Sequence, residues 1–186
     1  HTNLRNTGMG RPFKDIKIFM TTAEDILGPW SDPIELDSIG FDPSLFHDDD
    51  GKKYLLNMEW DFRKDRYRFA GIVIQALDVE TGKLTGPRTK ILQKQNILTE
   101  GPNLYKKDGW YYLMLAEGGT GWNHGISAAR SRNILGPYEL DPQPSVLTTR
   151  HREDWWLQKA GHGELMETPD GEWILDPRGS RPIVGR

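Results

Sequence analysis

The stretch Leu98–Tyr105, which reads Leu-Thr-Glu-Gly-Pro-Asn-Leu-Tyr, places a carboxylate before a Gly-Pro break and an apolar, aromatic strand pattern directly after it. A similar pattern occurs 58 residues earlier, in Phe41–Phe46, and 62 residues later, in Gly161–Met166. Each of the three segments opens with an ionisable residue, namely Asp42, Glu100 and His162. The sequence therefore predicts one structural unit repeated about every 60 residues.

An Asp-Gly dipeptide repeats in the same frame. Its glycine follows the ionisable residue by nine positions each time, at Gly51, Gly109 and Gly171. Asp-Gly suits a two-residue connection between antiparallel strands, so these dipeptides are interpreted as equivalent hairpin turns. Apolar and aromatic strand patterns follow them at residues 54–58, 110–116 and 172–175, and third strands are expected at residues 69–77 and 125–130.

A Gly-Pro turn is the third repeated feature. Residues 25–30 and 133–138 are near duplicates, and residues 83–87 resemble them more weakly. The glycines of these turns are Gly28, Gly86 and Gly136, and they precede the three ionisable residues by 14, 14 and 26 positions. The longer third spacing places a twelve-residue insertion before His162. Residues 15–22 and 34–36 are predicted strands, whereas residues 1–14 are expected to be a loop or the tail of an earlier unit.

These repeats predict an all-β protein. No stretch has a helical period, and a four-strand unit of about 50 to 60 residues is typical of a β-propeller blade. The division is a blade remnant at residues 1–40, blades at 41–98 and 99–160, and a partial blade at 161–186. Two complete blades and parts of two others are too few for a closed ring, so the chain is interpreted as a fragment of a larger propeller.

Composition excludes several classes of function. The net charge of -3 gives no basic field for nucleic acid, and the longest apolar run, residues 111–116, is too short to cross a bilayer. The chain has no cysteine, which excludes disulfides, thiolate zinc sites and cysteine nucleophiles. Seven Trp, six Tyr and six Phe exceed the needs of a core and favour a ligand groove. Localisation is left open.

The first strand of each propeller blade lines the central channel, so Asp42, Glu100 and His162 are predicted to converge there from one shared position. The alternative for each residue is a local cap at the start of a strand. Two neighbouring carboxylates cannot both ionise easily, so one holds a proton near neutral pH and can act as a general acid. Glycoside hydrolysis needs such a pair.

Other polar and aromatic residues carry weaker signals. Glu59 and Glu117, each 17 residues after a predicted site carboxylate, are interpreted as solvated loop charges, with contact to a substrate as the alternative. Each of four tryptophans is interpreted either as a packing residue or as a platform on which a sugar ring stacks, namely Trp60, Trp122, Trp155 and Trp156. Only Trp155 and Trp156, which lie inside the insertion, are favoured as substrate-binding residues.

The segments at residues 41–46, 99–106, 116–120 and 157–163 together resemble glycoside hydrolase family 43, especially its β-xylosidase branch. The resemblance implies a five-bladed propeller that hydrolyses β-xylosides or α-L-arabinofuranosides with inversion. It implies that Glu100 is the general acid and that Asp42 modulates the pKa of the acid. His162 matches an axial histidine beneath the sugar subsite, which in some members helps to hold a divalent cation such as calcium. No other cofactor is implied.

The chain also departs from the family pattern. The family's base Asp opens the first blade, upstream of residues 15–36, and Asp15 does not qualify because the hairpin frame does not follow it. Pro182–Arg186 resembles a Pro-Leu-Gly-Arg motif that arrives early, so Arg186 is carried over as a substrate contact. The chain alone is therefore predicted to be inactive or nearly so.

Several alternatives remain open. The rival to a glycosidase fragment is a non-catalytic carbohydrate-binding propeller, and a third reading is a protein-interaction propeller. Specificity for xylose or for arabinofuranose is not distinguished. The expected partners are an oligosaccharide and either the missing propeller blades or an oligomer partner, with no nucleic acid and no membrane.

Overall fold

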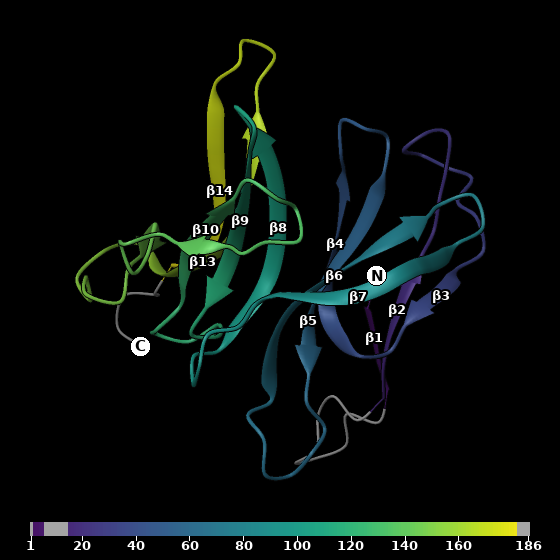
Figure 1. Ribbon diagram of the computed structural model, residues 1–186. Helices are drawn as coiled ribbons and strands as arrows, with labels where there is room; N and C mark the ends of the chain where they lie inside the picture. Colours follow the sequence, from purple (N-terminus) through teal and green to yellow (C-terminus); the bar gives the residue numbers. More distant parts are fainter. Residues whose placement is uncertain (1, 6–14, 182–186) are drawn as a thin grey trace.

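The computed structural model describes residues 2–5 and 15–181, which form β-strands joined by turns and loops (Figure 1). The prediction of an all-β fold is confirmed. The first sheet has the order β1-β2-β3. Its strands are β1 (Thr2–Arg5), β2 (Asp15–Met20) and β3 (Ile34–Asp37). Within the described ranges, no helix has the length and apolar character to cross a membrane.

The next two sheets are complete antiparallel meanders. The second sheet has the order β4-β5-β6-β7 and the third has β8-β9-β10-β11, with β12 also paired to β10. The second sheet contains β4 (Gly40–His47), β5 (Lys53–Trp60), β6 (Phe69–Asp78) and β7 (Lys83–Leu92). The third contains β8 (Thr99–Lys107), β9 (Trp110–Glu117), β10 (Gly125–Ser131), β11 (Glu139–Leu140) and β12 (Leu147–Thr148).

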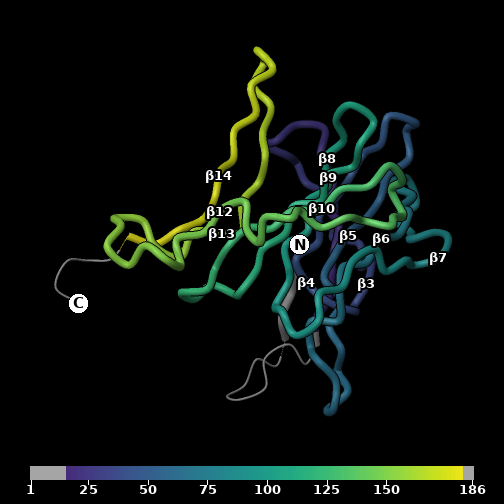
Figure 2. Tube along the Cα trace, turned by 60° about the vertical axis from the view of Figure 1, so that its left-hand side comes forward, coloured from purple at the N-terminus to yellow at the C-terminus, as the bar shows by residue number. Residues whose placement is uncertain are grey.

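The fourth sheet is the hairpin of β13 (Gln158–Glu167) and β14 (Trp173–Ser180). In Figure 2 this hairpin projects beyond the rest of the molecule. The strands predicted at residues 54–58, 69–77, 110–116 and 125–130 are confirmed to within two residues at either end.

The main hydrophobic core lies between the second and third sheets. Because side chains alternate across a strand, every second residue of β5 and β9 faces this core. Leu56 and Met58 of β5 and Leu113 of β9 are completely buried. The partners around them include Ile72, Ile74, Leu104, Leu115 and Ala129. Burial of these side chains fixes how the second and third sheets pack, and with them the first strands β4 and β8.

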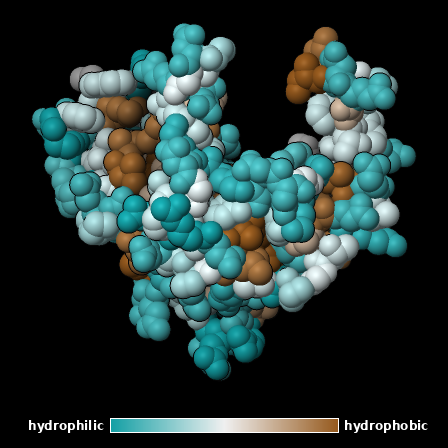
Figure 3. All heavy atoms as spheres, turned by 45° about the horizontal axis from the view of Figure 1, so that its top comes forward, coloured by the Kyte–Doolittle hydropathy of each residue, from teal (hydrophilic) through white to brown (hydrophobic). Residues whose placement is uncertain are grey.

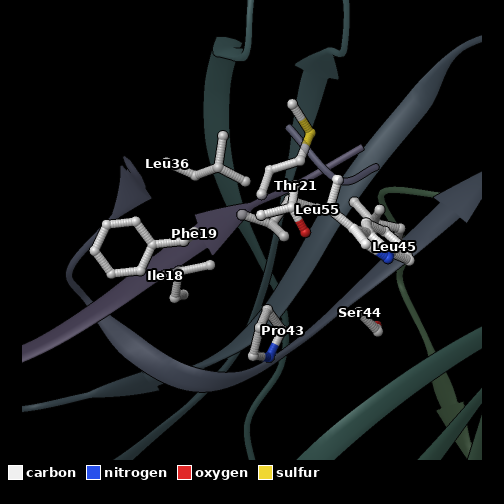
Figure 4. Close-up of a pocket in the computed structure, with 10 residues that line it drawn as sticks. Ile18, Phe19, Thr21, Leu36, Pro43, Ser44, Leu45 and Leu55 are labelled. Atoms are coloured by element: carbon white, nitrogen blue, oxygen red, sulfur yellow. The ribbon is translucent and has the colours of Figure 1, made fainter. Parts of the chain in front are cut away.

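A second apolar contact joins the first and second sheets and leaves a groove open to solvent (Figure 4). Ile18 and Leu36 of the first sheet approach Pro43, Leu45 and Leu55 of the second. Leu45 is half exposed, so this packing is less complete than the main core. In Figure 3, apolar side chains likewise reach the surface in patches between hydrophilic ones.

The three Asp-Gly turns are not equivalent, which corrects the prediction. Only Asp108-Gly109 is a two-residue turn, because Lys107 pairs directly with Trp110. Its φ values of 51° and 72° match the type I′ turn that Asp-Gly favours. The other two connections hold five residues each, 48–52 and 168–172, between the last paired residues of their strands. Backbone hydrogen bonds from Asp48 N–H to Lys52 O and from Thr168 N–H to Glu172 O close these connections, which leaves three residues in each turn itself. A three-residue turn displaces everything before it by one position relative to the two-residue turn.

Two further predictions were wrong. The weak Gly-Pro turn at residues 83–87 lies inside β7, whereas those at residues 25–30 and 133–138 lie between strands. β7 is the outer strand of its sheet and has a register shift opposite Ile74 and Ala76, which is where a sheet tolerates Gly-Pro. Gln75 donates a side-chain hydrogen bond of 2.9 Å to the Gly86 carbonyl there. Thr2–Arg5, expected as loop or tail, forms β1 by pairing with β2.

Candidate active site

The first strands of the last three sheets, β4, β8 and β13, each contain a bulge at the same place. In β4, Phe41 pairs with Met58 and Ser44 pairs with Leu56, which leaves Asp42 outside the regular ladder. The corresponding break in β8 lies between Glu100 and Asn103, and β13 has one between Gly161 and Gly163. A bulge redirects the side chains around it, which is useful next to a binding site.

The bulges show which residues are structurally equivalent. Asp42, Gly101 and His162 all have left-handed backbone, with φ values of 54°, 57° and 45°. Glu100 lies one residue earlier and corresponds to Phe41 and Gly161. The prediction that Glu100 shares the position of Asp42 and His162 was therefore wrong by one residue. The physical reason is the short β8–β9 turn described above.

Direct contacts hold the bulges together. The Ser44 hydroxyl donates a 2.5 Å hydrogen bond to the Pro102 carbonyl, and the backbone N–H of Gly101 lowers the pKa of the neighbouring Asp42 carboxyl. The His162 ring lies against Gly101, where an added Cβ would be 2.7 Å from Nε2. Only glycine fits at position 101 without displacing the imidazole. Asp42, Gly101 and His162 thus meet although they are distant in sequence.

A small polar pocket opens where these strands meet. The sequence predicted Asp42 and His162 as part of it but missed the contributions of Arg178 and Glu164. Arg178 comes from β14, where it pairs with Gly161, so only the strand register could have revealed it. The residues that line the pocket are Asp42, Pro43, Ser44, Gly101, Pro102, Asn103, His162, Glu164 and Arg178.

Glu100 adjoins this pocket and is half-buried. Burial, with a further contribution from the negative charge of Asp42, raises the pKa of Glu100 to about 7. Burial disfavours the charged form of a carboxyl, and a neighbouring negative charge acts in the same direction. Glu100 therefore holds a proton near neutral pH, as a general acid must.

Asp42 and His162 influence each other. Burial raises the pKa of Asp42, while His162, the Gly101 N–H and Arg178 act against this rise. Burial lowers the pKa of His162, and the positive charge of Arg178 and the neighbouring His124 lower it further, whereas Asp42 opposes them. The pocket thus brings the Asp42 carboxyl and the His162 imidazole together, and Glu100, which is not one of its lining residues, immediately precedes the lining residue Gly101.

Comparison with known proteins identifies the family. The model for glycosyl hydrolases family 43 matches residues 4–182. The chain belongs to family 43. It is 54% identical over 173 residues to xylosidase/arabinosidase 43B of Humicola insolens and 49% identical over 172 residues to a β-xylosidase of Bacillus subtilis. Each match covers 92% of the chain but 32% of the relative, so the chain spans about a third of these proteins.

Solved structures of the family agree with the fold. The crystal structure of xylan β-1,4-xylosidase from Bacillus halodurans superposes with a TM-score of 0.92 at 49% identity. The superposition covers 100% of this chain and 35% of that protein. The all-β fold is therefore similar to that of family 43 propeller proteins, and the resemblance of the sequence to family 43 is confirmed.

Two predicted substrate residues lie outside the pocket. Trp155 and Trp156 precede β13 and are exposed, with the Arg152 guanidinium 4.4 Å from the ring centroid of Trp155. The Arg181 guanidinium lies 5.1 Å from the ring centroid of Trp156. Arg186, the remaining predicted substrate contact, lies outside the described residues.

The weaker predictions have mixed outcomes. Glu117 is not a solvated loop charge: it is buried, forms an ion pair with Lys94 and accepts a 2.7 Å hydrogen bond from the Ser127 hydroxyl. Glu59 forms an ion pair with Lys90 at 2.6 Å. Trp60 packs against the main core, whereas Trp122 is 59% exposed. Trp60 also lines a surface pocket beside Glu59 and Lys90.

Across residues 2–5 and 15–181, no three or more His, Cys, Asp or Glu side chains come together as metal ligands. Arg178 lowers the pKa of His162 electrostatically, which also opposes a cation at that imidazole. No step in the chemistry below depends on a metal.

Proposed function

We propose that this chain is part of a β-xylosidase-like glycoside hydrolase that acts with inversion on xylo- or arabino-oligosaccharides. The observation that carries the proposal is the pKa of Glu100, about 7, beside a second carboxyl at Asp42. Membership of family 43 agrees with this chemistry. The complete protein is proposed to be a five-bladed propeller, of which residues 41–98 and 99–160 are two blades.

In the proposed reaction, Glu100 donates its proton to the glycosidic oxygen as the bond from that oxygen to the anomeric carbon breaks. A water molecule attacks the anomeric carbon from the opposite face, and a base removes one of its protons. The products are a free sugar and an alcohol. Glu100 ends as a carboxylate and recovers its proton from solvent.

Asp42 has two roles in this proposal. Its charge helps to keep Glu100 protonated, and its carboxyl lines the pocket beside Gly101, the residue after the acid. His162 and Arg178 line the pocket as binding groups for sugar hydroxyls. The pocket has no carboxylate assigned as the base, so we propose that the base belongs to a part of the whole enzyme beyond these residues.

The test is hydrolysis of a nitrophenyl β-xyloside and a nitrophenyl α-L-arabinofuranoside, with Glu100→Gln as the control and xylobiose calorimetry in parallel. Loss of a positioned acid or base costs on the order of 10²–10⁴ in rate, so the isolated chain is expected to bind xylobiose with little or no turnover. Reconstitution with the remaining blades should restore turnover in the unaltered chain but not in Glu100→Gln. Binding without turnover after reconstitution indicates a non-catalytic sugar-binding propeller. Absence of any saccharide binding contradicts the proposal.

A further inference from the structure

Lys159 has an unusual backbone conformation for its residue type. Its φ is 54°, in the left-handed region. The other described residues of this kind, apart from glycines, are Asp42, Asn96, Asp108 and His162. Asp, Asn and His adopt this conformation more readily than lysine does. Such strain persists where the surroundings enforce it, and it is concentrated at functional positions.

The surroundings of Lys159 fix its backbone firmly. Its carbonyl accepts a 2.9 Å hydrogen bond from Nδ1 of the buried His124, which must carry the proton because a carbonyl can only accept. The residues on either side, Gln158 and Ala160, are almost completely buried. The Ala160 N–H donates to the Thr149 hydroxyl at 3.2 Å. The Lys159 side chain therefore leaves the strand from a rigid base.

This side chain ends over an exposed aromatic ring. The Lys159 ammonium lies 4.9 Å from the ring centroid of Trp122, which is 59% exposed. No carboxylate among the described residues forms an ion pair with Lys159. An uncompensated cation thus stands beside an accessible indole, in a geometry suited to a ligand that has both an apolar face and a negative charge.

The position of the pair relates it to the candidate active site. Lys159 precedes His162 by three residues on β13. Trp122 belongs to the loop that follows β9, and the N–H of Gly118 in this loop donates a 3.1 Å hydrogen bond to Leu98 O, just before Glu100. Lys159 and Trp122 thus belong to the segments that lead into His162 and that contact the start of β8.

We propose that Lys159 and Trp122 form an accessory subsite for an acidic sugar, a uronic acid carried by a xylo-oligosaccharide. The sugar ring stacks on the indole of Trp122, and the carboxylate pairs with the Lys159 ammonium. This inference rests on the proposed function, because the oligosaccharide is positioned by the pocket of Asp42 and His162. A neutral oligosaccharide binds this subsite through stacking alone. The charge of Lys159 therefore determines the preference for the acidic ligand.

The chain contains a matched control for this pair. The Lys107 ammonium also lies 4.9 Å from a tryptophan ring centroid, that of Trp173. Lys107 is at the far end of β8 from Glu100, and it lacks the left-handed backbone of Lys159. Lys107→Met therefore removes a similar cation–aromatic contact away from the proposed subsite.

The experiment is calorimetric titration with xylotriose and with xylotriose that carries a uronic acid. The unaltered chain is expected to bind the acidic ligand about fivefold more tightly at low salt, a range typical of exposed ion pairs. Lys159→Met should reduce this preference to less than about twofold while leaving xylotriose binding unchanged. Trp122→Ala should weaken the binding of both ligands, and Lys107→Met should change the affinity for neither. High salt should suppress the preference for the acidic ligand.

A second variant separates function from folding. Lys159→Gly relieves the left-handed strain, so its melting temperature should rise although the preference for the acidic ligand is lost. Equal affinity for the two ligands in the unaltered chain, or a preference that survives Lys159→Met, overturns the subsite and leaves the proposed function intact. Failure to bind either ligand overturns both.

Discussion

Asp42 lies beside Gly101, the residue that follows Glu100, and the backbone N–H of Gly101 lowers the pKa of the Asp42 carboxyl. Burial raises the pKa of Glu100, and the negative charge of Asp42 raises it further. The Ser44 hydroxyl reinforces the link through its hydrogen bond to the Pro102 carbonyl, 2.5 Å away. The two bulged strands β4 and β8 therefore act as one unit at the pocket.

Glu100→Gln should change how stability depends on pH. Since folding raises the pKa of Glu100 from 4.5 to about 7, the folded chain binds more protons than the unfolded chain between these values. This contribution to stability is fully present below pH 4.5 and is lost as pH rises through about 7. Urea unfolding should therefore show the unaltered chain losing stability relative to Glu100→Gln across this window. A difference that stays constant with pH would show that Glu100 titrates normally.

Gly101→Ala should damage the site more than an alanine at another left-handed glycine. Its Cβ would lie 2.7 Å from Nε2 of His162, at a φ of 57°. Gly51 has a φ of 82° with open space around the missing Cβ, so Gly51→Ala costs only backbone strain of about 1–2 kcal/mol. We expect Gly101→Ala to lose about 1–3 kcal/mol more by urea unfolding and to weaken xylobiose binding. Equal losses for the two variants would show that His162 does not pack there.

Lys94→Met should be strongly destabilising because it leaves the buried carboxylate of Glu117 without its cation. Both side chains are largely inaccessible, at 12% and 8%. Removal of one partner of such a pair costs about 3–5 kcal/mol, whereas the double variant Lys94→Met/Glu117→Leu should recover much of the loss. Lys17→Met breaks an exposed pair with Glu35 and should cost less than about 1 kcal/mol. Comparable losses for Lys94→Met and Lys17→Met, measured by urea unfolding, would contradict the burial of the first pair.

The local parts of the fold could be read from the sequence. Alternation of apolar residues in β2 and the apolar content of β6 and β9 depend on side-chain burial, which hydrophobic patterns report directly. The recurrence of Asp42 and His162 in one frame also predicted that they meet. The hairpins that follow Asp42 and His162 have connections of the same length, so the nine-residue spacing to the Asp-Gly turn aligned these two residues correctly.

The errors came from features that sequence spacing does not encode. Asp-Gly occurs in both the two-residue and the three-residue turns, so it could not show that Glu100 is displaced by one position. The contribution of Arg178 depends on pairing across the β13–β14 hairpin. The buried environment of Glu117 depends on Lys94 and Ser127, which approach it from other segments.

The measurement that tests the account most directly is an NMR titration of the Glu100 carboxyl in chain labelled with ¹³C-glutamate. The Glu100 signal is assigned by its absence in Glu100→Gln. We predict a midpoint of about 7 in the unaltered chain and a lower midpoint in Asp42→Asn, because the charge that helps to hold the proton has been removed. A midpoint near 4.5 in the unaltered chain, or one that Asp42→Asn does not lower, would contradict the assignment of Glu100 as an acid tuned by Asp42.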